Sequence, residues 1–182
     1  MIRRFPLLFV PLLLGFAASA GPEAVAGPAS AREDELKAAY VYNFAKFARW
    51  PGTGDAGVPN PLVIGVLGDE RVAEAIIALT RGRTVGGSVI EVKSFGANDV
   101  PATLHIIYIG DSQDEALHRL AGTLFQSGRL TIGETESFTQ HGGIIRLFVE
   151  VDRLRFEIDN SHAQKAGLTL SSQLLMLARK VN

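Results

Sequence analysis

Three short apolar runs, each followed at once by a glycine and an acid, constrain the fold of this chain more than any other feature. The runs cover 62–67, 105–109 and 130–132, and the pairs that follow them are Gly68-Asp69, Gly110-Asp111 and Gly133-Glu134. After the first two pairs, apolar residues recur with the period of a helix, over 70–79 and 114–125. Parallel strands need long, usually helical, crossovers, so the pattern predicts βα units around a parallel sheet. A further strand is expected over 89–92.

The last third of the chain follows a different pattern. Apolar and polar residues alternate over 145–151 and again over 154–158, which predicts an antiparallel hairpin with one solvated face. A short helix is expected over 160–167, and a terminal helix capped by Ser171 or Ser172 is expected to reach Val181 with Leu177 on its buried side. The predicted fold is a single α/β domain: a mixed sheet with parallel βα units and a C-terminal antiparallel hairpin, with helices on both faces.

The segment 33–50 is predicted to be a helix that ends before Pro51. Four large side chains share one face of it and are expected to pack in the core: Leu36, Tyr40, Phe44 and Phe47. The other faces also carry apolar residues, which is typical of a helix that is either fully buried or covered by a partner. Tyr42 and Trp50 are therefore candidates for an interface.

The N-terminus has the three-part pattern of a secretory signal peptide. Arg3 and Arg4 precede an apolar run that is too short to span a bilayer, and the small residues 18–20 form a cleavage site. We expect residues 1–20 to be removed after Ala20, residues 21–31 to form a flexible leader, and residues 32–182 to form the domain.

Composition and motifs exclude several classes of function. The chain has no cysteine, so it has no disulfide and no thiolate ligand, and its 18 basic and 19 acidic residues give no basic excess for nucleic acid. The sequence contains no phosphate-binding loop, no H-E-x-x-H and no G-x-S-x-G. We therefore expect no catalytic residue, no metal and no cofactor.

The acids that follow the strands leave one alternative open. Ligands of open α/β sheets bind at the carboxyl ends of the strands, so Asp69 and Asp111 could line a pocket for a small molecule. A domain of this kind would be an accessory of a two-component or transport system. The same acids, with Glu134, could instead hold Mg²⁺ or simply cap helices, and capping is the commoner role.

Two stretches of sequence resemble a known family. The first runs from Leu36-Lys37-Ala38-Ala39-Tyr40 through Asn43-Phe44 to Trp50-Pro51, and the second includes Gly142-Gly143-Ile144, Arg155-Phe156-Glu157-Ile158 and Ser171-Ser172-Gln173-Leu174-Leu175. Together they resemble the YfiR family of exported bacterial proteins, over about residues 33–181. Both end motifs are fairly specific, whereas the middle of the chain is generic.

The resemblance implies a periplasmic regulator that is not an enzyme. Members of the family bind the periplasmic domain of a membrane-anchored, YfiN-like diguanylate cyclase and repress it, which lowers cyclic di-GMP and biofilm formation. A YfiB-like outer-membrane lipoprotein sequesters the repressor, and a homodimer is a further implied partner. The family's namesake relies on disulfides, whereas this chain has no cysteine, so redox control of that kind is absent. The candidate contact residues are Tyr42, Phe47 and Trp50, with Arg153 and Arg155 as a polar rim.

Overall fold

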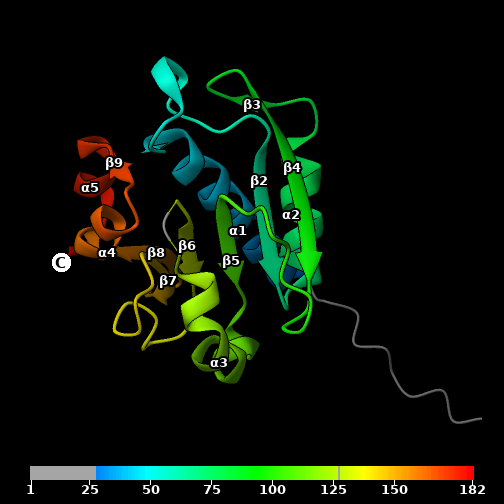
Figure 1. Ribbon diagram of the computed structural model, residues 1–182. Coiled ribbons are helices and arrows are strands. Elements are labelled where there is room, and N and C mark those ends of the chain that lie inside the picture. The colour runs from blue at the N-terminus through cyan, green and yellow to red at the C-terminus, as the bar shows by residue number, and fades with distance from the viewer. Residues whose placement is uncertain (1–27, 127) are drawn as a thin grey trace, which may run out of the picture.

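An eight-stranded sheet forms the centre of the molecule (Figure 1). The computed structural model describes residues 28–126 and 128–182 of the chain. The strands lie in the order β10-β8-β7-β6-β5-β2-β4-β3. Their bounds are β2 Leu62–Leu67, β3 Thr84–Val85, β4 Ser88–Phe95, β5 Ile106–Ile109, β6 Leu130–Gly133, β7 Ile145–Glu150, β8 Arg153–Ile158 and β10 Lys180–Val181.

Helices cover both faces of this sheet, which confirms the predicted fold class. One face packs against α1 (Pro28–Phe47), α2 (Glu70–Thr80), α4 (Asn160–Lys165) and α5 (Ser172–Leu177), and α3 (Asp114–Leu124) covers the other. The two faces bury separate apolar clusters, to which alternate residues of β2 contribute: Leu62 and Ile64 to one, Val63 and Leu67 to the other. This alternation is what a strand covered on both faces requires.

The parallel and antiparallel parts of the sheet agree with the prediction from the sequence. Strand β2 pairs in parallel with both β4 and β5, and β5, β6 and β7 continue the parallel order. Strands β7 and β8 form the predicted antiparallel hairpin, whose tip holds Val151 and Asp152 at φ of 49° and 55°. The sequence did not reveal β3, which forms a small antiparallel hairpin with the start of β4.

The first helix differs from the prediction in its bounds and in its buried face. It begins at Pro28, inside the stretch 21–31, and ends at Phe47, after which β1 (Ala48–Arg49) pairs with β9 (Thr169–Leu170). Leu36 is 46% exposed, whereas Ala38, Val41 and Ala45 are fully buried. The expected core position of Leu36 is therefore wrong, because small residues bring α1 close to its neighbours and set which face is buried.

The expected terminal helix to Val181 is also wrong. Ser171 does cap α5, its hydroxyl accepting from Leu174 N at 3.2 Å, but the helix ends at Leu177. The chain then extends as β10, and Arg179 N donates to Phe156 O at 2.8 Å. The last residues thus form backbone hydrogen bonds with the open edge of β8. Leu177 is 69% exposed instead of buried.

The predicted signal peptide and most of the predicted leader lie outside the described residues. Among the helices of residues 28–126 and 128–182, none is both long enough and apolar enough to cross a membrane.

Candidate functional site

Asp69 and Asp111 follow neighbouring strands, β2 and β5, at the carboxyl edge of the sheet. The chain moves from one side of β2 to the other between β4 and β5, so this edge is the switch point at which open α/β folds bind ligands. Asp69, however, caps α2, because its Oδ1 accepts from Val72 N at 3.1 Å. Asp111 is exposed at the start of the short 3₁₀ helix Asp111–Gln113.

The chain itself fills the crevice between these strands. A side chain at Gly68 would clash with Gln113, so Gln113 lies directly over this glycine. A Cβ at Gly110 would lie 3.2 Å from the Cβ of Asp69. The residues around Asp69 and Asp111 therefore pack against one another, and the geometry gives little support to a small-molecule pocket at this edge.

The third acid of the pattern, Glu134, belongs to a cluster that the sequence did not reveal. Lys37 Nζ lies 2.8 Å from Glu134 Oε2 and 2.9 Å from Glu33 Oε1, and Tyr108 donates its hydroxyl to Glu134 Oε1. Lys37 is 7% exposed and Tyr108 is fully buried. The cluster therefore links α1 to the ends of β5 and β6. The sequence gives no clear signal for this cluster, because Lys37 is one of several charged residues on α1.

The charges of this cluster shift the pKa values of its members. Burial alone would lower the pKa of the Lys37 ammonium, but the hydrogen bonds with Glu134 and Glu33 outweigh it and the pKa is raised. Burial and then the charge of Glu134 raise the pKa of the Tyr108 hydroxyl, which therefore stays a donor. Among the residues that the structure describes, no group of three or more histidines or acids could hold a metal ion.

The aromatic candidates at the end of α1 make contacts within the chain. Tyr42 is half-buried, and its hydroxyl donates to Thr84 O at 3.3 Å, while Lys46 and Arg83 lie over its ring at 5.6 and 5.8 Å. Phe47 is half-buried against the main core. These two residues are partly accessible, but Tyr42 lies near β3, at the far edge of the sheet from β8.

Trp50 lies inside the molecule. It is 5% exposed, and its Nε1 donates to Gly128 O at 3.0 Å, while its backbone N donates to Gly57 O at 2.9 Å. A side chain with so little exposed surface can make few contacts with a second protein. Trp50 instead anchors the segment after α1, and Arg49 Nη1, which donates to Ala56 O at 2.6 Å, adds to that anchor.

Arg153 and Arg155 lie exposed on β8, on the solvated face of the hairpin. Their cross-strand neighbours are Glu150 and Phe148 of β7. This face lies opposite the one that packs on α1, because Phe156 contacts the rings of Tyr40 and Phe44. The structure therefore does not bring these arginines together with Tyr42, and the predicted contact residues do not form one surface.

A group of exposed apolar side chains that the sequence did not reveal lies at the same end of the molecule as the arginines. Val149 is 58% exposed, Val151 88%, Met176 77% and Leu177 69%. Leu177 and Arg155 line a shallow cavity of 380 Å³ together with Glu150, Ala178 and Arg179. We call Val149, Val151, Arg153, Arg155, Met176 and Leu177 the hairpin-end surface.

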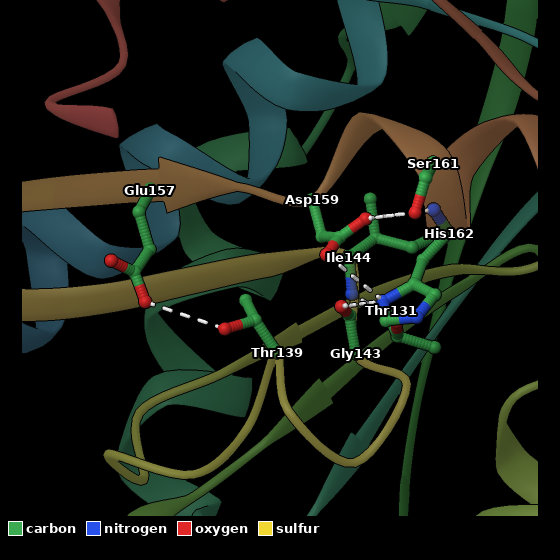
Figure 2. Close-up of polar contacts among 8 residues, drawn as sticks. All are labelled: Thr131, Thr139, Gly143, Ile144, Glu157, Asp159, Ser161 and His162. Atoms are coloured by element: carbon green, nitrogen blue, oxygen red, sulfur yellow. Dashed lines mark hydrogen bonds and ion pairs between the residues drawn. The ribbon is translucent and has the colours of Figure 1, made fainter. Parts of the chain in front are cut away.

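The loop 134–144 joins β6 to β7 and has a network of its own (Figure 2). Ile144 N donates to Thr131 Oγ1 at 3.0 Å, and the ring of His162 lies with Nδ1 3.2 Å from Gly143 O (Figure 2). A side chain at Gly143 would clash with the buried ring of Phe138. The Gly142-Gly143-Ile144 motif is therefore required for packing, because Phe138 covers the sheet here in place of a helix.

The comparison with protein families matches the chain over residues 34–179 to the model described as YfiR/HmsC-like. No curated protein matches the sequence. The matched range begins within α1, ends at the residue before β10, and includes both end motifs. The chain belongs to the YfiR/HmsC-like family.

Proposed function

We propose that this protein is a periplasmic regulator that binds the periplasmic domain of a membrane-anchored, YfiN-like diguanylate cyclase and holds the cyclase inactive. Repression lowers cyclic di-GMP and biofilm formation. The observation that carries the proposal is the family match, which covers nearly the whole described domain. Family membership itself points to a regulator rather than to an enzyme. The repressor needs only a higher affinity for the inactive than for the active cyclase.

The hairpin-end surface is the part of the molecule best suited to bind the cyclase. It places four exposed apolar side chains at the end of the molecule that also holds Arg153 and Arg155, and Arg155 and Leu177 line the same cavity. Apolar and charged side chains of this kind occur together in interfaces. Isolated exposed apolar residues are common. Here Leu177 lines a shallow cavity together with Arg155, and Met176 precedes Leu177 on α5. A YfiB-like outer-membrane lipoprotein is the second partner in this proposal and would compete with the cyclase for the repressor.

Deletion of the gene, followed by complementation, tests the proposal. We expect cyclic di-GMP to rise in the deletion strain and to return to its original level with the wild-type protein. Leu177→Glu should fail to restore repression, because a charge at the centre of an interface has no partner once water is excluded. Unchanged cyclic di-GMP after deletion would overturn the regulatory function.

Leu36→Glu is the matched control for Leu177→Glu. Both leucines are exposed on a helix: Leu36 is 46% exposed and Leu177 is 69% exposed. Leu36, however, lies on α1, outside the hairpin-end surface. Leu36→Glu should repress like the wild type. Equal loss of repression in the two variants, with both proteins folded and present in the periplasm, would remove the hairpin-end surface from the proposal.

A further inference from the structure

A cavity of 380 Å³ lies at the amino-terminal edge of the sheet. Arg129 and Ile144, which directly precede β6 and β7, line it together with residues of α3, of the loop 134–144 and of α4. Asp69 and Asp111 follow strands at the opposite, carboxyl edge of the sheet. No residue of the hairpin-end surface lines this cavity, so it is separate from both sites discussed above.

Arg129 brings a positive charge into this part of the molecule. The residue is 8% exposed, and its guanidinium donates to Thr123 O at the end of α3 and to Ala102 O. These carbonyl groups hold the guanidinium in place but have no net charge, and no carboxylate of the described residues forms an ion pair with it. Burial accordingly lowers the pKa of Arg129. Because buried charges in proteins are normally paired, the site lacks a counter-ion.

The other charged or titratable groups of the cavity are also basic. Lys165 lines it, is exposed, and has no ion pair within residues 28–126 and 128–182. The ring of His162 lies with Nδ1 3.2 Å from Gly143 O and 3.5 Å from Asp159 Oδ2, so its Nε2 is left for a further partner (Figure 2). Among the described residues that line the cavity, none is an aspartate or a glutamate. The cavity therefore attracts an anion.

The cavity also offers space and apolar contacts to a larger molecule. Phe125, which is half-buried, and Ile144, which is buried, both line it. Gly122 leaves part of the wall open, because an added Cβ there would have nothing within 4 Å. A volume of 380 Å³ is in the range of sites for small organic ligands and far exceeds the space that a water-sized ion needs. A matching ligand therefore has an apolar body beside its charge.

We propose that this cavity binds a small organic carboxylate. Its negative charge lies against Arg129 and Lys165, and its apolar body packs against Phe125 and Ile144. Two of the five N–H donors of the Arg129 guanidinium are used by carbonyl groups, so donors remain for the carboxylate, and the bound anion supplies the missing counter-ion. The inference does not rest on the proposed function, because it concerns binding by the protein alone.

Titration of the mature protein with 3-phenylpropionate, followed through its backbone amide resonances, tests the inference. The carboxylate should bind at millimolar concentration or below and shift the resonances of Gly122 and Gly142, which line the cavity. The neutral analogue 3-phenylpropionamide has the same shape and should bind about tenfold more weakly or worse, because it cannot neutralise Arg129. Inorganic phosphate has charge but no apolar body, and it should also bind more weakly than 3-phenylpropionate.

Two variants locate the charge that binds. Arg129→Gln should weaken the binding of 3-phenylpropionate about tenfold or more. Lys165→Gln changes an exposed residue that the fold does not need, and it should weaken binding about threefold. Lys93→Gln, at an exposed lysine of β4, is the matched control and should bind like the wild type.

Three results would overturn the inference. They are no binding of 3-phenylpropionate, binding no tighter than that of its amide or of phosphate, and binding that Arg129→Gln and Lys165→Gln both leave unchanged. All are measured on the purified protein without a cyclase, so they are distinct from a failure of the proposed function.

Discussion

Lys37 shows at the scale of a single residue how this protein accommodates a buried charge. Its ammonium lies between Glu33 and Glu134, and Tyr108 donates to the same Glu134 carboxylate. A buried ion pair of this kind adds little net stability over apolar packing, but removing one partner leaves an uncompensated charge. The two acids differ in exposure: the Glu134 side chain is 14% exposed and the Glu33 side chain 44%.

We expect Glu134→Gln to lower the free energy of unfolding by about 2–3 kcal/mol, since it leaves Lys37 and Tyr108 with a neutral partner in a buried site. The matched change Glu33→Gln removes an ion pair of similar length from a more exposed position and should cost about 0.5 kcal/mol or less. Denaturant unfolding of both variants measures the difference. Equal effects would mean that burial does not govern the strength of these pairs.

Asp34 gives a prediction for the dependence of stability on pH. Burial, opposed first by the charge of Arg71 and then reinforced by that of Asp69, raises the pKa of this carboxyl above 3.8. A carboxyl with a raised pKa destabilises the folded state progressively as the pH rises above 3.8, and the full loss is reached above its folded-state pKa. Asp34→Asn should therefore raise the melting temperature at pH 7, and the gain should shrink as the pH falls toward 3.8 and below. A lower melting temperature at pH 7 would show that the 3.5 Å contact with Arg71 matters more.

At the scale of elements, the loop 134–144 takes the place of a crossover helix between β6 and β7. Phe138 provides its packing and is fully buried in the cluster beneath α3. Side chains at Gly133 and at Gly143 would each clash with its ring. The loop therefore depends on one aromatic residue and the two glycines that accommodate it.

Gly143→Ala should destabilise the protein by about 1–3 kcal/mol, because the added methyl group overpacks a buried site. Gly122→Ala is the control: Gly122 lies on α3 with nothing within 4 Å of an added Cβ, so alanine should be neutral or stabilise by up to about 1 kcal/mol. Melting temperatures of the two variants give the comparison. Adding Phe138→Leu to Gly143→Ala should recover part of the loss; failure to do so would place the strain elsewhere.

The sequence predicted well those strands and helices whose bounds follow from the apolar pattern of their own residues. The run 62–67 became β2 with its predicted bounds, and the helix expected over 70–79 became α2. The end of the chain was mispredicted because α5 and β10 depend on a remote strand: Phe156 and Ile158 accept from Arg179 and Asn182. The periodicity of neighbouring residues does not predict a contact between segments far apart in the chain.

At the scale of the whole molecule, the proposed partner surface lies toward one edge of the sheet. We propose that the cyclase binds the hairpin-end surface, which lies at the β8 end of the sheet.

Arg155→Glu should weaken binding to the periplasmic domain of the cyclase by about 1 kcal/mol or more, and the loss should shrink at high salt because salt screens charges at the rim of an interface. Arg32→Glu, an exposed arginine at the start of α1, should leave the affinity unchanged. Titration calorimetry at two ionic strengths measures both. Equal affinities for wild type and Arg155→Glu would exclude this arginine from the contact.

The sequence by itself determined the fold class and the family. The apolar runs of the strands, the period of the helices and the two end motifs are each properties of residues close together in the chain. It also identified Arg153 and Arg155 as exposed, since alternation places them on the solvated face of a hairpin. Only the tertiary structure decided that Trp50 is buried, that Glu134 pairs with Lys37 and that Leu177 is exposed. Each of these outcomes depends on contacts between residues far apart in the chain, and the geometry of such contacts exists only once the sheet has formed.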